Sequence, residues 1–388
     1  MNIRNLYIVV VLFLFTSCNY NKKVETYELL QNGKTIFRLD DNTSFFSKAV
    51  FCFTDPFTGK EYLSFENNNS VQQEIIIWNI DSLKLIKKIQ IAREGPNGLQ
   101  LKGHYIKSLD SIYVTTVGQN IIALVNSKGC ILQKIKCEKS VTNEPVSSFS
   151  SISILYHPIV QIGTNFYLKQ SNMQYAPSGD DWARTPLNAK VDTLNHVISF
   201  SLLKHPRFWE KNSPILNSIN IDASYEYDGH NFIYSFCKLD SIIVTKDHTK
   251  FQKYEAKSKY LSNVKCELEN ESDIMGIERA ACKQSTYWHF VYDKYRDVYY
   301  RFAFLPCELE PNDNPMDVEL HRQKFSVIIL NNKFEVIGET LFPKNKYSPK
   351  MFFVGKKGLY ISESNPKNPE FDENKLVFSC FTLAQKKI

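Results

Sequence analysis

The hydrophobic and polar positions of this chain follow the pattern of short strands. Runs of β-branched and aromatic residues recur along the sequence, and Gly, Pro, Asn and Asp residues separate them. Beyond residues 1–18 there is almost no window in which apolar residues recur with the spacing of a helix. Short apolar runs with turn residues between them are typical of β-strands. The pattern therefore predicts an all-β fold.

One structural unit recurs within this pattern. It consists of an apolar run, an Asn or Asp turn and a second, more polar strand, and successive turns lie 45 to 84 residues apart. Two further strands precede each of these hairpins, so a unit contains four strands. The turn residues are Asp81, Asn126, Asp192, Asp247 and Asn331. Four-stranded units of ~40–50 residues with insertions are the size of propeller blades, so the repeats predict a β-propeller.

The prediction counts six blades. Residues 35–39 form an N-terminal strand without another partner, which would supply the missing outer strand of the last blade and close the ring. Seven blades would result if residues 259–286, or a hairpin around Asn32 and Gly33, form another unit. A pair of β-sandwiches is the alternative, but it explains the repeated hairpins less well. The complete units cover residues 49–91, 104–137, 151–203, 223–258 and 287–342, and the last unit lies within residues 351–383.

The N-terminus has the features of a secretory signal. Arg4 precedes an apolar run over residues 6–15 that is too short to span a bilayer, and the small residues Thr16 and Ser17 follow it. The next residue is Cys18. A soluble secreted protein that is cut nearby and a short anchor helix are the alternatives to a lipid-anchored protein.

Residues 15–18 resemble the lipobox of bacterial lipoproteins, although Phe15 stands where Leu is usual. The resemblance implies that Cys18 is lipidated and becomes the new N-terminus. The chain is accordingly divided into a signal peptide (1–17), a lipidated tether (18–26) and a β-propeller domain (27–388).

Charge and cysteine content exclude several classes of protein. The formal net charge is +6, from 47 Lys and Arg and 41 Asp and Glu, and the basic residues are scattered among acidic ones. This pattern lacks the electrostatic footprint of a nucleic-acid-binding protein. The cysteines other than Cys18 form no Cys-x-x-Cys pair, and several lie within apolar runs. They are interpreted as small buried hydrophobic residues, and no disulfide is predicted.

Two segments of the mature chain resemble a known family. Arg93-Glu94-Gly95-Pro96-Asn97-Gly98 resembles the Gly-x-Gly-Pro-Gly loop of the six-bladed propeller lipoproteins of Bacteroidota, with Arg93 and Asn97 in place of two glycines. Together with the lipobox and the segment 292–302, this loop is similar to lipoproteins of the family known as domain of unknown function 4221. The resemblance implies a tethered propeller and brings no established activity with it.

The residues after Cys18 bear on location. Many such lipoproteins carry acidic residues there as a signal for export to the cell surface, but residues 19–23 contain none. The resemblance therefore implies a lipoprotein of the bacterial cell envelope, anchored in the outer membrane and facing the periplasm.

Four residues are candidate ligand contacts. Arg93 begins the Gly-rich loop at the expected mouth of the channel, and Trp182 stands in the polar insertion 171–195. Tyr299 and Arg301 belong to an aromatic and cationic hairpin, in which they lie on the face opposite to a predicted core face. Such side chains stack on sugar rings or planar ligands. Turn geometry, loop anchoring and strand packing are the competing explanations.

No catalytic or metal-binding set of residues emerges. The acidic residues within 306–323 lack the spacing of a calcium loop, so a solvated acidic loop is predicted there. The histidines lack zinc-site spacing, and no phosphate-binding loop or nucleophile elbow is present. We therefore expect no metal ion and no cofactor.

The sequence favours a non-catalytic function. It predicts a binding or scaffold module of the cell envelope whose partner is a glycan, a peptide or another envelope protein. The alternative is an enzyme, a glycan hydrolase or lyase whose carboxylates come from separate inner strands.

Overall fold

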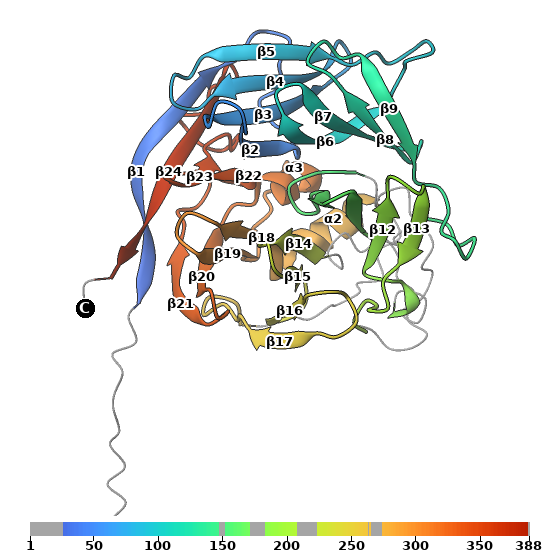
Figure 1. Cartoon of the computed structure of the whole chain (residues 1–388). Helices are drawn as coiled ribbons and strands as arrows, with labels where there is room; N and C mark the ends of the chain where they lie inside the picture. Colours follow the sequence, from blue (N-terminus) through green and yellow to red (C-terminus); the bar gives the residue numbers. More distant parts are fainter. Residues whose placement is uncertain are drawn as a thin grey trace, which may run out of the picture.

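The computed structural model describes residues 26–146, 152–170, 183–207, 223–262, 264 and 274–386. Its strands form four four-stranded sheets and one eight-stranded sheet, which are arranged around a common centre (Figure 1). Strand β3 contacts β6, β14 contacts β18, and β2 contacts β22, so the last sheet meets the first. This arrangement confirms the predicted all-β fold and is propeller-like.

The four smaller sheets follow one another along the chain. The first contains β2 (Val50–Thr54), β3 (Glu61–Asn68), β4 (Gln73–Asn79) and β5 (Leu85–Gln90). The second contains β6 (Leu101–Ser108), β7 (Ser111–Thr116), β8 (Ile121–Val125) and β9 (Ile131–Lys136). The third contains β10 (Val160–Ile162), β11 (Asn165–Lys169), β12 (Asn188–Asp192) and β13 (Val197–Phe200). The fourth contains β14 (Ala223–Tyr227), β15 (Phe232–Phe236), β16 (Ser241–Thr245) and β17 (Gln252–Glu255). These four sheets coincide with the first four predicted units.

The eight-stranded sheet joins the two ends of the chain. Its strands, in order, are β18 (Thr286–Asp293), β19 (Val298–Phe304), β20 (Phe325–Asn331), β21 (Val336–Leu341), β1 (Tyr27–Arg38), β24 (Lys375–Gln385), β23 (Gly358–Ser362) and β22 (Ser348–Gly355). β1 runs antiparallel to β24 and meets β21 in one parallel pair, Tyr27 with Gly338. A Cβ atom on Gly338 would lie 2.0 Å from the Tyr27 carbonyl oxygen, so this contact requires glycine. The expected pairing of the N-terminal strand with the last unit is confirmed.

Two expectations about local structure are wrong. No hairpin forms around Asn32 and Gly33, because β1 continues through them with a shift of register between Gln31 and Lys34, and Gly33 takes the positive φ of 92°. Two helices also interrupt the strands, α2 (Ile274–Lys283) and α3 (Pro315–His321). Both are short, and the sequence analysis missed them although α2 is amphipathic and α3 begins with an Asn cap before Pro315. None of the helices within the described residues is long and apolar enough to cross a membrane.

The core is distributed between the sheets. In β4, Ile76 packs into one apolar cluster, while Ile75 and Ile77 pack into another on the opposite face. All three side chains are fully buried. A strand that is covered on both faces has a continuous apolar run instead of an alternating pattern. This explains why the central strands are such conspicuous apolar runs in the sequence.

The cysteines within the described residues are all free thiols. Five of them are buried, Cys52 is half-buried and Cys130 is exposed. The interpretation as small buried hydrophobic residues is therefore confirmed for the five, which are Cys137, Cys237, Cys282, Cys307 and Cys380.

Candidate functional site

A short segment crosses the centre of the ring. Residues 152–158, here called the crossing segment, pair with β6 through a bridge between Ser153 and Gly103. The backbone N–H of Leu155 donates to the carbonyl oxygen of Lys48 at 2.9 Å, and the N–H of Tyr225 in β14 donates to that of Tyr156 at 3.0 Å. The crossing segment therefore contacts the inner strands of several sheets.

Three inner strands are irregular near their N-terminal ends. The pairing register shifts between Leu101 and His104 in β6, between Tyr287 and Phe290 in β18, and between Ser348 and Phe352 in β22. Such bulges change the direction of side chains and are frequent beside functional sites. The residues within the three irregular stretches include Lys102, Trp288, His289 and Lys350.

The bulge in β22 places a lysine between an acid and an aromatic ring. Lys350 is 4% exposed, and its ammonium group forms an ion pair with Glu319 of α3 and lies 4.3 Å from the centre of the Trp288 ring. Burial alone would raise the pKa of Glu319, but the charges of Lys350 and Arg322 outweigh this effect and lower it. Arg322 lies 3.6 Å from Glu319. The Glu319 carboxylate is thus held in its ionised form.

Helix α2 brings a second carboxylate to this region. Its C-terminal carbonyl groups at Ala281 and Cys282 accept hydrogen bonds from the Arg322 guanidinium, at 3.1 and 3.2 Å, which fixes α2 to the end of α3. Glu278 of α2 is 9% exposed. Burial, with the nearby charge of Glu319, raises the pKa of Glu278 to about 7. The two carboxylates therefore differ widely in acidity.

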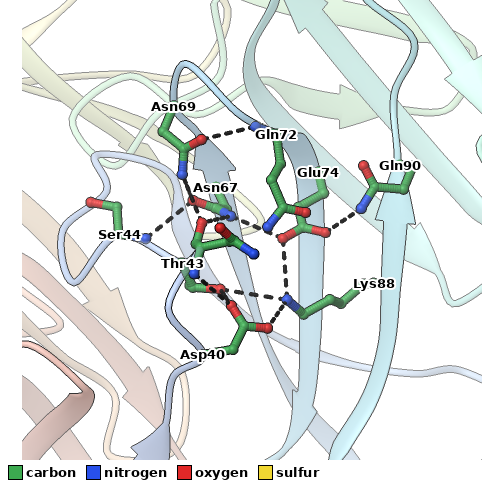
Figure 2. A network of polar contacts seen from close by, with 10 residues as sticks. Asp40, Thr43, Ser44, Asn67, Asn69, Gln72, Glu74, Lys88 and Gln90 are labelled. Carbon is green, nitrogen blue, oxygen red and sulfur yellow. Dashed lines mark hydrogen bonds and ion pairs between the residues drawn. The ribbon is translucent and has the colours of Figure 1, made fainter.

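The loop between β1 and β2 is fixed by a polar network on the first sheet. Figure 2 shows Lys88 of β5 between the carboxylates of Asp40 and Glu74, and the Asn67 side chain beside Glu74. The side-chain amides of Asn67 and Asn69 both donate to the carbonyl oxygen of Asn42. These bonds attach the start of the loop to β3, β4 and β5.

The end of this loop delivers Lys48 to the centre of the ring. Phe45 and Phe46 pack against the His321 ring of α3, with ring centres 6.4 and 5.2 Å apart. Lys48 follows, and its carbonyl oxygen holds the crossing segment. The Lys48 side chain is exposed, but the protein around it displaces part of the water near its ammonium group. This loss of water, together with the charges of Lys350 and Lys102, lowers the pKa of Lys48 to about 8.

Lys48, Lys102 and Lys350 form what we call the lysine cluster. Their charges act on one another, and in the described part of the chain neither Lys48 nor Lys102 has an ion-pair partner. The charge of Lys102 also acts on Glu66, although burial raises the pKa of this carboxyl group. With Arg322 the region holds four cationic groups against the three carboxyl groups of Glu66, Glu278 and Glu319. The region has an excess of positive charge.

His289 lies in the same region without a hydrogen-bond partner. The side chain is 1% exposed, and neither ring nitrogen meets a donor or acceptor among the described residues. Its ring packs against Phe352 of β22, with the ring centres 4.9 Å apart. Burial, with the charges of Lys350 and Lys48, lowers the pKa of His289, so the ring is neutral at pH 7. A neutral imidazole still has one N–H group to donate.

Arg93, Tyr299 and Arg301 form their hydrogen bonds with residues outside the lysine cluster. Arg93 is exposed, and its guanidinium donates to the Asn68 side chain at 3.1 Å and to the Gln72 carbonyl at 3.0 Å, at the turn between β3 and β4. Tyr299 is 3% exposed and donates to Asp228 at 2.7 Å. No described hydrogen bond joins these two residues.

Arg301 is fully buried between the fourth sheet and β19. Its guanidinium donates to Ser235 and to the carbonyl groups of Ala256, Phe236 and Leu239, and stacks 3.5 Å from the Tyr287 ring centre. The predicted alternation of side chains between the two faces of β19 is confirmed. One core cluster contains Val298, Tyr300, Phe302 and Phe304, and another contains Tyr299. The geometry gives Tyr299 and Arg301 packing contacts, and their role in ligand binding stays a prediction. Trp182 and Cys18 lie outside the described residues.

The sequence analysis missed every member of the lysine cluster. It also interpreted residues 306–323 as a solvated acidic loop, which is wrong for Glu319, since this residue is 5% exposed and ion-paired. The spacing Glu319–Arg322 in a segment with Pro315 after Asn314 is a signal for a short capped helix with an internal ion pair. The three lysines carry no such local signal.

Comparison with known proteins identifies the family. The model of the family named Domain of unknown function (DUF4221) matches residues 26–341. The chain belongs to this family. A crystal structure of a DUF4221 member from Bacteroides vulgatus is 34% identical, with a TM-score of 0.84, and the match covers 94% of this chain and 100% of that one.

More distant relatives show the fold alone. A structure from Bacteroides fragilis is 11% identical, with a TM-score of 0.52, and the match covers 93% of this chain and 96% of that one. No curated protein matches the sequence. The DUF4221 assignment agrees with the resemblance seen in the sequence, and it transfers no activity.

Proposed function

We propose that this DUF4221 protein is a binding module of the cell envelope, and that it binds an anionic group of a glycan or peptide at the lysine cluster. The observation that carries the proposal is the pair of ammonium groups of Lys48 and Lys102, which form no ion pair within the described residues although Lys350 is ion-paired. Neighbouring cations without ion-pair partners repel one another, and a bound carboxylate, sulfate or phosphate group would offset that repulsion.

Replacing Lys48 and Lys102 with alanine should weaken the binding of acidic ligands. The probes are an oligogalacturonate and an oligoglutamate, each compared with a neutral oligomer of the same length by isothermal titration calorimetry. A charge-assisted hydrogen bond contributes about 1.5 kcal/mol, so each substitution should weaken binding about tenfold. Binding of the preferred acidic probe by the wild type should also weaken as salt is raised.

Lys253→Ala is the matched control, because Lys253 is an exposed lysine on the outer strand β17. It should bind as the wild type does. If the wild type binds acidic and neutral oligomers equally, or if the Lys48 and Lys102 variants keep full affinity, the lysine cluster is not the binding site.

One observation favours an enzyme as the second candidate function. Glu278, whose pKa is raised to about 7, and Glu319, whose pKa is lowered, resemble the acid and base of a glycan hydrolase or lyase, which also differ in acidity. Glu319 is, however, buried and ion-paired with Lys350, which leaves it little access to a substrate. The burial of Glu319 therefore favours a binding function over an enzymatic one. Release of new sugar ends from the oligogalacturonate by the wild type, but not by Glu278→Gln, would support the enzyme.

We also propose that the ring has six blades. In this count the eight-stranded sheet is two blades, one formed by β18–β21 and the other by β22, β23, β24 and β1. The single parallel pair of Tyr27 and Gly338 supports this division, because it is far less extensive than the antiparallel pairing of β1 with β24.

We further propose that Cys18 carries the lipid anchor. Cys18→Ala should move the protein from the membrane fraction and the detergent phase to the soluble fraction, since a single residue would hold the anchor. The measurement is cell fractionation with detergent phase partitioning. Cys130→Ala, at an exposed cysteine of the propeller-like domain, is the control and should remain with the membrane. Normal partition of the Cys18→Ala protein would contradict the anchor.

A further inference from the structure

A second candidate site is a cavity of about 270 Å³ whose lining includes none of the three lysines of the lysine cluster. Its walls come from the C-terminal halves of β14, β18 and β22, from β2 and from the crossing segment. Most of the lining is apolar or aromatic, with Phe51, Leu155, Val291, Phe352 and Val354 among the lining residues. The volume is near the lower limit of ligand pockets, which are about 300–1,000 Å³, so the cavity suits a small ligand.

Glu226 of β14 is the one carboxylate in this lining. One carboxylate oxygen accepts a hydrogen bond from the N–H of Tyr227 at 2.9 Å, and the other accepts from the N–H of Tyr292 at 3.3 Å. These two bonds fix the carboxylate at the cavity wall. Each oxygen keeps a free lone pair, and within the described residues no Lys or Arg forms an ion pair with Glu226.

The charge that acts on Glu226 is negative, like its own. Asp228 is the neighbouring charge that acts on it, and burial, with this charge as a smaller contribution, raises the pKa of Glu226 to about 7. The other charged group in the lining, Lys294, is exposed and lies 5.1 Å from the Tyr295 ring centre. A carboxylate on an apolar wall without a cationic partner is unstable unless it is protonated or meets a cation.

We propose that this cavity binds a small, mostly apolar primary amine whose ammonium group donates hydrogen bonds to the Glu226 carboxylate. An ammonium group supplies donors for the free lone pairs and a charge opposite to that of the carboxylate. The apolar body of the ligand packs against the phenylalanine and valine side chains, whose burial favours binding. Aromatic rings in the lining attract the cation further.

Three probes of similar size but different charge test the proposal. Phenethylamine, 2-phenylethanol and phenylacetate are titrated at pH 8 by calorimetry. Wild-type protein should bind phenethylamine at least about tenfold more tightly than 2-phenylethanol, and phenylacetate should not bind measurably. Glu226→Gln should lose the preference for the amine, and Val354→Phe, which narrows the cavity, should weaken all binding. Glu373→Gln, at an exposed carboxylate, is the matched control and should behave as the wild type.

Melting curves verify that each variant is folded. If Glu226→Gln does not fold, Glu226→Asp takes its place. This variant should bind phenethylamine more weakly than the wild type does, but should still prefer it to 2-phenylethanol. Absence of binding by all three probes, equal binding of the amine and the alcohol, or an amine preference that survives in Glu226→Gln would each overturn the proposal. Lys48→Ala should leave amine binding unchanged, so failure at the lysine cluster is distinguishable from failure here.

Discussion

Removal of β1 should destroy most of the stability of this protein. β1 pairs with β24 from Tyr27 to Arg38, and it buries Leu29 and Phe37, which are 4% and 0% exposed. Burial of such side chains contributes about 1.5–3 kcal/mol each. Their loss, together with the newly unpaired edge of β24, should remove at least about 5 kcal/mol, against a total stability of about 5–15 kcal/mol for an ordinary domain.

The experiment compares three chains that begin at residues 19, 26 and 39, all without the signal segment. Circular dichroism should give similar melting temperatures for the first two and an unfolded or much less stable third chain. Phe37→Ala in the longest chain is an intermediate case and should cost about 3–5 kcal/mol, because it leaves a cavity in the core beside Trp78. Equal melting of the chains that begin at residues 26 and 39 would show that the ring closes without β1.

Much of the fold could be predicted from the sequence because the strands are local units. A run such as Ile75–Ile77 is buried on both faces, and the turn at Asp81 brings the next strand back beside it, so pattern and pairing agree. The closing strand could be predicted by counting the strands of each unit, since the last unit lacked its outer strand. The helices were missed because each is short, so that the local signals at α2 and at the Asn314 cap of α3 span few residues, and tertiary contacts such as the bonds from Arg322 to the end of α2 help to hold them.

The candidate site was far less predictable. Lys48, Lys102 and Lys350 lie on separate segments, and each is an ordinary lysine in its own sequence context. Only the bulges in the inner strands and the loop that packs on α3 bring them together, and neither feature has a strong signature in a single sequence. Arg301 illustrates a different difficulty. Its aromatic and cationic neighbours in the sequence suggested a ligand site, which stays a prediction, and in the structure the same chemistry makes a buried contact between sheets.

Replacement of Arg301 with alanine should therefore cost stability. The guanidinium satisfies the carbonyl groups of Ala256, Phe236 and Leu239, with nitrogen–oxygen distances of 2.8, 3.3 and 2.6 Å, and it stacks on Tyr287. Alanine would remove the guanidinium donors from these carbonyl groups and would open a cavity beside the ring. Loss of a buried, fully hydrogen-bonded charged side chain costs about 3–5 kcal/mol, which urea unfolding would detect.

Arg93→Ala is the matched control, because Arg93 is an exposed arginine that also donates to backbone carbonyl groups. It should lose no more than about 1 kcal/mol, since water replaces the lost bonds at the surface. Arg301→Lys should fall between the two, because an ammonium group keeps the charge but cannot reach all the acceptors of a planar guanidinium. Wild-type stability of Arg301→Ala, combined with weaker binding of an acidic probe, would return Arg301 to the ligand site and contradict its assignment to packing.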